Sequence, residues 1–254
     1  GKIEITQRGA AFVVVEGRDK DVYIAPQNVS QALNGDIVKV RIFKQGPNRD
    51  EGAVFEIKER ERFQFVGTIK ITEKYAILVP DNNRTGIEMH ISKENLMGAK
   101  PGEKVLAKIT VWPKSSDTPY GEVIAVLGMP GSNDTEMLSI LYSQGINPVF
   151  PSAVLDEAEY VPIDLDPKEI ENRRDFREVL TFTIDPFDAK DFDDAISYKV
   201  LENGNLEVGV HIADVSHYVR PGTAMDAEAV LRSNSVYLVD RVIPMLPEQL
   251  SNIA

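Results

Sequence analysis

The stretch GKIEIT at residues 1–6 returns as GTIKIT at residues 67–72, with apolar side chains at the same alternate positions. Further along the chain, GDIVKVRI at residues 35–42 returns as GEKVLAKI at residues 102–109. The two shifts are nearly equal, 66 and 67 residues. A repeat of this kind indicates one structural unit that is present twice.

Short runs of alternating apolar residues fill each copy, and Gly, Asn, Asp or Pro separates them. In the first copy, Ile3 and Ile5 form one run and Phe12 and Val14 another. Alternation with period two is typical of strands with one buried face. About five such runs in roughly 60 residues predict a five-stranded oligonucleotide-binding barrel. We therefore expect two all-β barrels, in residues 1–59 and 60–131.

The composition restricts the class of protein. The 254 residues carry a net charge of −12 and include no cysteine. Without cysteine there are no disulfides or thiolate metal sites, which agrees with a reducing compartment, and we expect a cytoplasmic protein. No apolar run approaches the roughly 18–20 residues that cross a bilayer, and no signal-peptide pattern is present. We therefore expect no membrane partner.

The negative charge lies in one part of the chain. Residues 1–60 and 61–131 each carry a net charge of +1, whereas residues 132–254 carry −14. Two nearly neutral domains can bind nucleic acid through local basic patches. The acidic segment is either a solvated face or a site that holds cations, and the spacing of its carboxylates decides between the two.

The last segment, residues 132–254, has a mixed α and β pattern. It follows a boundary at GMPGSNDTE, where Asn133 and Glu136 form a capping-box pattern that predicts a helix. Asp166 before Pro167 predicts a second helix, which we expect to carry the arginines at 173, 174 and 177. Two apolar runs that flank ENGN predict a β-hairpin.

The segment TFTIDPFDAKDFDDAISYK, residues 181–199, holds five aspartates and one lysine between positions 185 and 194. Carboxylates this close raise one another's pKa unless solvent or a divalent cation screens them. Apolar residues on both sides predict flanking strands, which disfavours a simple solvated loop. An EF-hand loop also fails, because Ile196 stands where that loop needs Gly. What remains is an all-oxygen site for a hard cation, whose usual enzymatic work is phosphoryl chemistry.

Several stretches together resemble one family. Residues 8–42 look like a cold-shock domain, and residues 65–127 look like a more divergent copy. The pattern D-x-x-x-A-x-D-x-D-D-A, residues 185–195, resembles the signature of the ribonuclease II/ribonuclease R catalytic domain. Three further stretches match that family's later blocks in its order: VGVHIADVSHYVRPGTAMDAEA from residue 208, SVYL from residue 235 and RVIPMLPEQLSN from residue 241.

The resemblance implies an Mg²⁺-dependent exoribonuclease that hydrolyses single-stranded RNA processively from its 3′ end and releases nucleoside 5′-monophosphates. The family's four catalytic and metal-binding aspartates fall on Asp185, Asp191, Asp193 and Asp194, while Asp188 falls at a variable position. We expect Asp185 and Asp194 to be the primary metal ligands. Asp191 and Asp193 would position a second metal ion or the attacking water.

The resemblance also points to RNA-contacting rings. Tyr237 matches a tyrosine that packs against the 3′-terminal nucleotide. In cold-shock barrels, aromatic side chains on the outer face of the second and third strands stack on bases, which indicates Phe12 and Tyr23 in the first copy. Tyr75 and His90 hold the corresponding positions in the second copy. The alternative interpretation of each ring is core or ordinary surface.

The family's sequences extend beyond these blocks, so we expect this chain to be the front part of a longer, active protein. By itself, the 254-residue chain is expected to bind RNA weakly without turnover. Its expected partner is single-stranded RNA, with the ribosome or RNA-decay factors as further candidates, and we expect a monomer. The competing hypothesis is a non-catalytic RNA-binding or RNA-chaperone module. A nucleophilic triad of His211, Asp214 and Ser216 is disfavoured, because residues so near in sequence can hardly form the required chain of hydrogen bonds.

Overall fold

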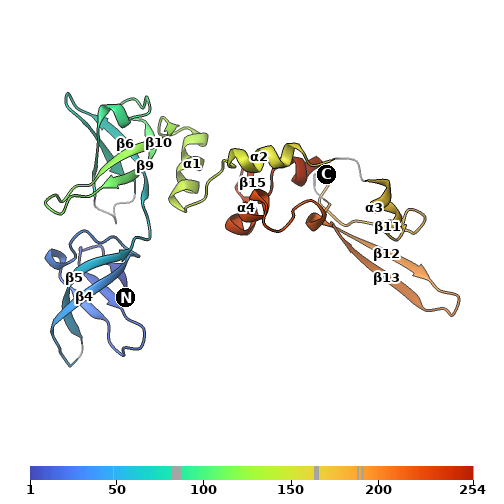
Figure 1. Ribbon diagram of the computed structural model, residues 1–254, viewed down its shortest axis with the longest axis horizontal. Helices are drawn as coiled ribbons and strands as arrows, with labels where there is room; N and C mark the ends of the chain where they lie inside the picture. Colours follow the sequence, from blue (N-terminus) through green and yellow to red (C-terminus); the bar gives the residue numbers. More distant parts are fainter. Residues whose placement is uncertain (48, 82–86, 163–165, 188, 190–191, 254) are drawn as a thin grey trace. The chain divides into compact units, whose positions relative to one another are not determined.

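The computed structural model describes residues 1–47, 49–81, 87–162, 166–187, 189 and 192–253 (Figure 1). The chain forms two compact units, Gly1–Asn147 and Pro148–Ala254. Within the described part of the chain, no helix is long and apolar enough to cross a membrane.

The first five strands close into a barrel in the order β1-β2-β3-β5-β4. They are β1 (Lys2–Ile5), β2 (Ala11–Val14), β3 (Val22–Ile24), β4 (Ile37–Lys44) and β5 (Asp50–Glu59), with a 3₁₀ turn, η1, at Pro26–Asn28 between β3 and β4. Neighbouring strands are antiparallel except β3 and β5, which are parallel and close the barrel. The barrel predicted from the period-two pattern is confirmed.

The second barrel repeats this plan in the order β10-β8-β7-β6-β9. Its strands are β6 (Gln64–Ile71), β7 (Ala76–Pro80), β8 (Met89–Ile91), β9 (Lys104–Val111) and β10 (Tyr120–Gly128), with η2 at Lys93–Asn95. The parallel closure recurs between β8 and β10. The sequence repeat therefore corresponds to two copies of one barrel.

Equivalent residues of the two copies build the two cores. Ile24 is buried in the first core and Ile91, 67 positions later, in the second. Val29 and Leu96 are buried at the same spacing. In each barrel, one of these residues precedes the short 3₁₀ turn and the other follows it, and both are buried. The turn is therefore packed against the core and is not a free loop.

Contacts between the two barrels centre on Arg60, which lies in the segment that joins them. Its guanidinium faces the fully buried Asp36 carboxylate at 3.3 Å and lies 5.4 Å from the ring centre of Trp112 in the second barrel. The Gln31 side chain donates to the Pro113 carbonyl oxygen at 2.6 Å. These contacts hold the two barrels within one compact unit.

Helix α1 (Asn133–Ser143) packs on the second barrel. Ser132 is its N-cap and accepts a hydrogen bond from the Thr135 N–H, so the predicted helix is confirmed but its cap is one residue earlier than Asn133. Leu138 and Tyr142 contact a buried cluster made of Val66, Leu106 and Leu127. Because α1 belongs to the first compact unit, the domain limits at 59/60 and 131/132 stay a prediction.

The second unit combines short helices with two small sheets. The helices are α2 (Ser152–Glu159), α3 (Pro167–Glu171), η3 (Val215–His217), α4 (Ala224–Arg232) and the π-helical turn η4 (Gln249–Ile253). The Glu157 carboxylate of α2 accepts from the N–H groups of Ala224 and Met225, at 2.9 and 2.8 Å. It therefore caps α4, where the helix dipole favours a negative charge.

Helix α3 is shorter than predicted. Asp166 is its N-cap as expected, but the helix ends at Glu171, and the arginines at 173, 174 and 177 lie beyond it. Each arginine is drawn to a different carboxylate: Arg173 to Asp214, Arg174 to Glu207 and Arg177 to Asp175. The expectation of one helix that carries all three was wrong, because these ion pairs favour an irregular chain that reaches towards the neighbouring hairpin.

The sheets of this unit are β11-β12-β13 and β14-β15. Their strands are β11 (Thr181–Phe182), β12 (Asp194–Val200), β13 (Leu206–Ile212), β14 (Val236–Tyr237) and β15 (Val242–Ile243). The predicted hairpin is confirmed as β12–β13, and Gly204 in its ENGN turn adopts a φ of +81°. The second unit is thus the mixed α and β segment that the sequence predicted.

Candidate carboxylate site and nucleic-acid interface

The acidic loop runs between β11 and β12, as the apolar flanks predicted. Asp194 is the first residue of β12 and pairs with Ile212 across the hairpin, and the backbone carbonyl of Asp193 accepts from the Ala213 N–H at 2.8 Å. Both side chains are exposed. The register of the hairpin therefore fixes the backbone that presents these two adjacent carboxylates.

Asp185 lies at the start of the loop, after β11, and is half-buried. Its Oδ2 atom is buried and has no hydrogen-bond partner among the described residues. A buried carboxylate oxygen without a partner is costly, and a bound cation is one way to satisfy it. The donors of this loop are all oxygens, which fits a hard divalent cation.

The structure describes three of the four candidate aspartates, Asp185, Asp193 and Asp194. Asp191 and the neighbouring Asp188 fall outside the described residues. Within the described part of the chain, no group of three or more His, Asp or Glu side chains is arranged to hold a metal ion. Asp193 and Asp194 are adjacent through the chain, and Asp185 enters the same loop from its other end.

A polar and aromatic cluster holds the hairpin on the side opposite Asp194. The buried Ser197 Oγ lies 2.8 Å from Nε2 of His211 on the facing strand. The Phe176 ring contacts His211 edge-on, with centroids 4.6 Å apart, and Arg174 lies over Phe176 while it binds Glu207. This cluster ties the segment after α3 to β13.

The three residues of the rejected triad behave as expected. His211 bonds to Ser197, whereas Asp214 accepts from Arg173 and from the Ser216 hydroxyl at 2.8 and 2.9 Å. The Arg173 guanidinium lowers the pKa of the Asp214 carboxyl, with a smaller contribution from Ser216. Asp214 is thus a fixed anion in an ion pair.

The first barrel presents its two predicted rings side by side. Phe12 of β2 is the cross-strand partner of Tyr23 of β3, and the rings meet edge-on with centroids 5.6 Å apart. Arg49 lies over the Tyr23 ring, 4.2 Å from its centre. Ring faces beside a guanidinium can accept stacked bases.

The second barrel carries a three-ring cluster on its outer wall. Tyr75 stacks on His90 with centroids 5.0 Å apart, and Tyr120 meets His90 edge-on at 5.8 Å. Tyr120 was not singled out from the sequence. It reaches His90 because β10 closes the barrel alongside β8, a parallel pairing that local pattern does not reveal.

Tyr237, the remaining candidate, lies in β14 opposite Val242 and is exposed. It belongs to the same compact unit as the acidic loop. Its ring is therefore free to contact a ligand, while its role stays a prediction.

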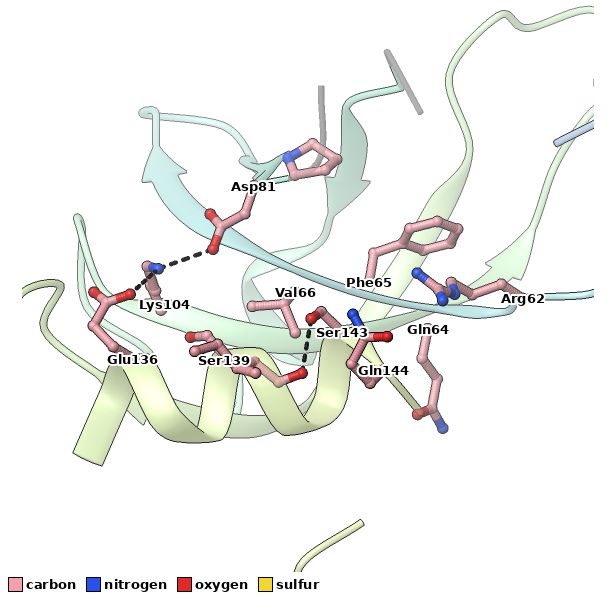
Figure 2. Close-up of a pocket in the computed structure, with 12 residues that line it drawn as sticks. Arg62, Gln64, Phe65, Val66, Asp81, Lys104, Glu136, Ser139, Ser143 and Gln144 are labelled. Carbon is pink, nitrogen blue, oxygen red and sulfur yellow. Dashed lines mark hydrogen bonds and ion pairs between the residues drawn. The ribbon is translucent and has the colours of Figure 1, made fainter. Parts of the chain in front are cut away.

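A cleft of about 430 Å³ lies where α1 meets the second barrel. Figure 2 shows Lys104 with Asp81 and Glu136 at one end, and Arg62 with Gln64 at the other. Lys104 bonds to Asp81 at 3.0 Å and to Glu136 at 2.9 Å. Burial acts to lower the pKa of Lys104, but the hydrogen bonds with Glu136 and Asp81 outweigh it and raise that pKa. The positive charge of Lys104 is therefore balanced by two carboxylates, and its ion pair with Glu136 fastens α1 to the barrel.

Three family models match successive parts of the chain: a ribonuclease B OB domain over residues 1–57, a cold shock domain over residues 77–151 and an RNB domain over residues 173–254. The chain belongs to the ribonuclease II/ribonuclease R family. Ribonuclease R of Thermotoga maritima is 37% identical over 99% of this chain and 36% of its own length. Ribonuclease R 1 of Lactococcus lactis is 39% identical over 96% of this chain and 32% of its own length. The chain thus spans about a third of these relatives.

Solved structures of other proteins share the fold. Mycoplasma genitalium ribonuclease R in complex with ribose-methylated single-stranded RNA has a TM-score of 0.86 at 26% identity, over 99% of this chain and 40% of its own. A yeast protein described as a pseudonuclease has a TM-score of 0.70 at 23% identity, over 99% of this chain and 38% of its own. This fold therefore occurs both with and without nuclease activity, and the side chains of the site must decide between them.

Proposed function

We propose that this chain forms part of a divalent-metal-dependent exoribonuclease that hydrolyses single-stranded RNA processively from the 3′ end to nucleoside 5′-monophosphates. The observation that carries the proposal is the acidic loop. Asp185 has a buried carboxylate oxygen without a partner among the described residues, and the hairpin register presents Asp193 and Asp194 at the other end of the same loop. A solvated acidic turn would have no reason to bury an unpaired carboxylate.

Asp185 and Asp194 would be the primary ligands of Mg²⁺, and Asp191 and Asp193 would position a second ion or the attacking water. When bound, divalent cations would activate water and neutralise charge on the scissile phosphate. The chain's own contribution is to hold the carboxylates: β12 fixes Asp194, and the bond from Ala213 to the Asp193 carbonyl fixes the turn before it. Tyr237 would pack against the 3′-terminal nucleotide.

The barrels would bind single-stranded RNA upstream of the site. The support is the pair of ring clusters on their outer walls, each of which can stack bases without reading sequence. Domain limits at 1–59, 60–131 and 132–254 go with this division of roles. The ribosome or RNA-decay factors are further candidate partners, and we propose a monomeric protein in the cytoplasm.

The isolated 254-residue chain would bind RNA without turnover. One face of β13 places Leu206, Val208, Val210 and Ile212 in solvent, each 63–72% exposed. An apolar sheet face of this size is normally covered, and the relatives have about twice as much further sequence that could cover it. Because Asp194 pairs with Ile212, the carboxylate site borders this uncovered face.

The test is shortening, by the complete protein, of a single strand of RNA labelled near its 5′ end, with Mg²⁺ present and with Mg²⁺ removed by chelation. Chromatography of the released products identifies the mononucleotides. We expect progressive shortening from the 3′ end only with the cation. The alternative is a non-catalytic RNA-binding module. A complete protein that binds the strand but never shortens it in Mg²⁺ or Mn²⁺ would support that alternative and contradict the proposal.

A further inference from the structure

Two phenylalanines on the strand pair β4–β5 of the first barrel point into solvent. Ile42 pairs with Gly52 and Lys44 with Glu51, so Phe43 is an extra residue at a β-bulge. Val40 pairs with Val54 and Lys39 with Glu56, so Phe55 is the extra residue on the opposite strand. Their side chains are 60% and 61% exposed. Bulges re-aim side chains and are frequent beside functional sites.

Arg41 lies between the two bulges. It pairs with Ala53, whose short side chain leaves it room, and its guanidinium carbon lies 4.9 Å from the ring centre of Phe55. A guanidinium over a ring offers its own flat face for stacking. Phe43, Arg41 and Phe55 thus provide two neighbouring stacking surfaces on one wall of the barrel.

The uncompensated charge around these rings is positive. The nearby carboxylates are paired, Glu51 with Lys44 and Glu56 with Lys58, each at 2.8 Å. Lys39 and Arg41 make no ion pair with any described residue. The hydrogen bond from Lys58 lowers the pKa of the Glu56 carboxyl, and the charges of Lys39 and Lys114 act in the same direction. Such a surface attracts a polyanion, and the exposed rings beside its cations suit the bases of a single-stranded nucleic acid.

The wall also joins the predicted RNA face. Tyr23 is the neighbour of Glu51 across the parallel β3–β5 pair, and Arg49, which lies over Tyr23, also acts on Glu51. A nucleic-acid strand that stacks on Phe12 and Tyr23 can therefore continue across β5 onto β4, the neighbouring strands of the same barrel.

We propose that Lys39, Arg41, Phe43 and Phe55, the bulge patch, form a second contact site for single-stranded nucleic acid. One base stacks on Phe43 and one on the Arg41 guanidinium over Phe55, while Lys39 contacts phosphate. The inference rests on the proposed RNA binding and extends it beyond β2–β3, which lengthens the strand held by the first barrel.

The test is fluorescence anisotropy of the 254-residue chain with labelled oligouridylates of six and sixteen nucleotides. We expect Phe43→Ala and Phe55→Ala each to weaken binding of the longer strand by roughly 5-fold or more, because stacking on a ring contributes about 1–3 kcal/mol per base. Binding of the shorter strand should change less. Lys39→Gln should lower the salt dependence of binding to the longer strand, because Lys39 is the residue proposed to contact phosphate.

The matched control is Phe63→Ala, since Phe63 is 56% exposed in the segment between the barrels, outside the patch. It should leave both affinities unchanged. Circular dichroism melting checks that each variant folds, and Phe43→Leu and Phe55→Leu keep the apolar volume without the ring should an alanine variant unfold. The leucine variants should show the same loss for the longer strand.

The outcomes separate the two levels of the proposal. If Tyr23→Ala weakens binding but the patch variants match Phe63→Ala, the bulge patch is not an RNA site and the RNA-binding function stands. If neither Tyr23→Ala nor the patch variants change binding, or the unaltered chain binds neither strand, the proposed RNA face itself fails. Self-association of the chain that Phe43→Ala abolishes, with RNA affinity retained, would assign the patch to a protein contact instead.

Discussion

The Ser197 hydroxyl and Nε2 of His211 lie 2.8 Å apart across the β12–β13 hairpin, on the side of the sheet opposite Asp194. Ser197 is buried, so removal of its hydroxyl leaves a histidine nitrogen without its partner. We expect Ser197→Ala to lower the free energy of unfolding by about 1 kcal/mol. Urea unfolding of the chain, followed by fluorescence, measures it. Ser216→Ala, which removes an exposed hydroxyl, should cost clearly less, and equal losses would contradict this account of the hairpin.

The buried Asp36 carboxylate organises the junction of the barrels. It accepts from the N–H groups of Leu33 and Glu61, at 2.8 and 3.1 Å, and faces Arg60. Asp36→Ala leaves both donors unsatisfied, and we expect a loss of about 2 kcal/mol or more in thermal or urea unfolding. Asp36→Asn keeps one acceptor oxygen and should lose less.

The control for this junction is the exposed Asp19, whose replacement by Ala should change stability by no more than a few tenths of a kcal/mol. If Asp36→Ala proved as stable as Asp19→Ala, Asp36 would not hold the junction together.

Asp175 offers a pH test of the segment after α3. Side-chain and backbone hydrogen bonds from Arg177 lower the pKa of Asp175 from 3.8 to about 2. Because the folded pKa is depressed, the stabilisation is present above pH 3.8 and is lost as the pH falls through about 2. An NMR titration of the Asp175 carboxyl carbon should give a midpoint near 2, and Arg177→Gln should move it towards 3.8. A midpoint near 3.8 in both proteins would show that the pair does not form in solution.

The barrels could be predicted from the sequence, because a period-two pattern and a repeat are local properties of the chain. The strand pairs that close each barrel could not be predicted, since β3 meets β5 and β8 meets β10 through parallel pairings between distant residues. That is why Tyr120 was missed beside His90. The bulges that expose Phe43 and Phe55 depend on a one-residue register shift, which alternation alone does not specify.

In the second unit, the acidic loop and its flanking strands followed from the apolar residues on each side. The end of α3 did not, because arginines are favourable in a helix, and the distant partners of Arg173 and Arg174, Asp214 and Glu207, are not evident from local sequence. The Ser197–His211 contact was invisible for a similar reason, since it depends on cross-strand register.

For the 254-residue chain itself, we expect weak, salt-sensitive binding of single-stranded RNA and no significant hydrolysis. The net charge over residues 1–131 is only +2, so phosphate contacts must be few and affinity should fall as salt rises. The site borders an uncovered apolar face, and we expect that the isolated chain positions a phosphate poorly for displacement. Equilibrium binding of labelled polyadenylate at increasing salt checks the first point, and incubation of the same strand with Mg²⁺ checks the second. Steady mononucleotide release at the rate of the complete protein would show that the site is self-sufficient.

The acidic loop is proposed as the site of RNA hydrolysis, and Asp193→Asn in the complete protein tests this role directly. Single-turnover release of mononucleotides and equilibrium binding of the same strand are measured side by side, with the exposed Glu202→Gln at the hairpin turn as the control. We expect Asp193→Asn to lower the rate by about 100-fold or more while affinity stays near normal, because lost transition-state electrostatics have this effect. Glu202→Gln should change neither. Retention of more than about a tenth of the normal rate by Asp193→Asn would contradict the assignment of this loop as the catalytic site.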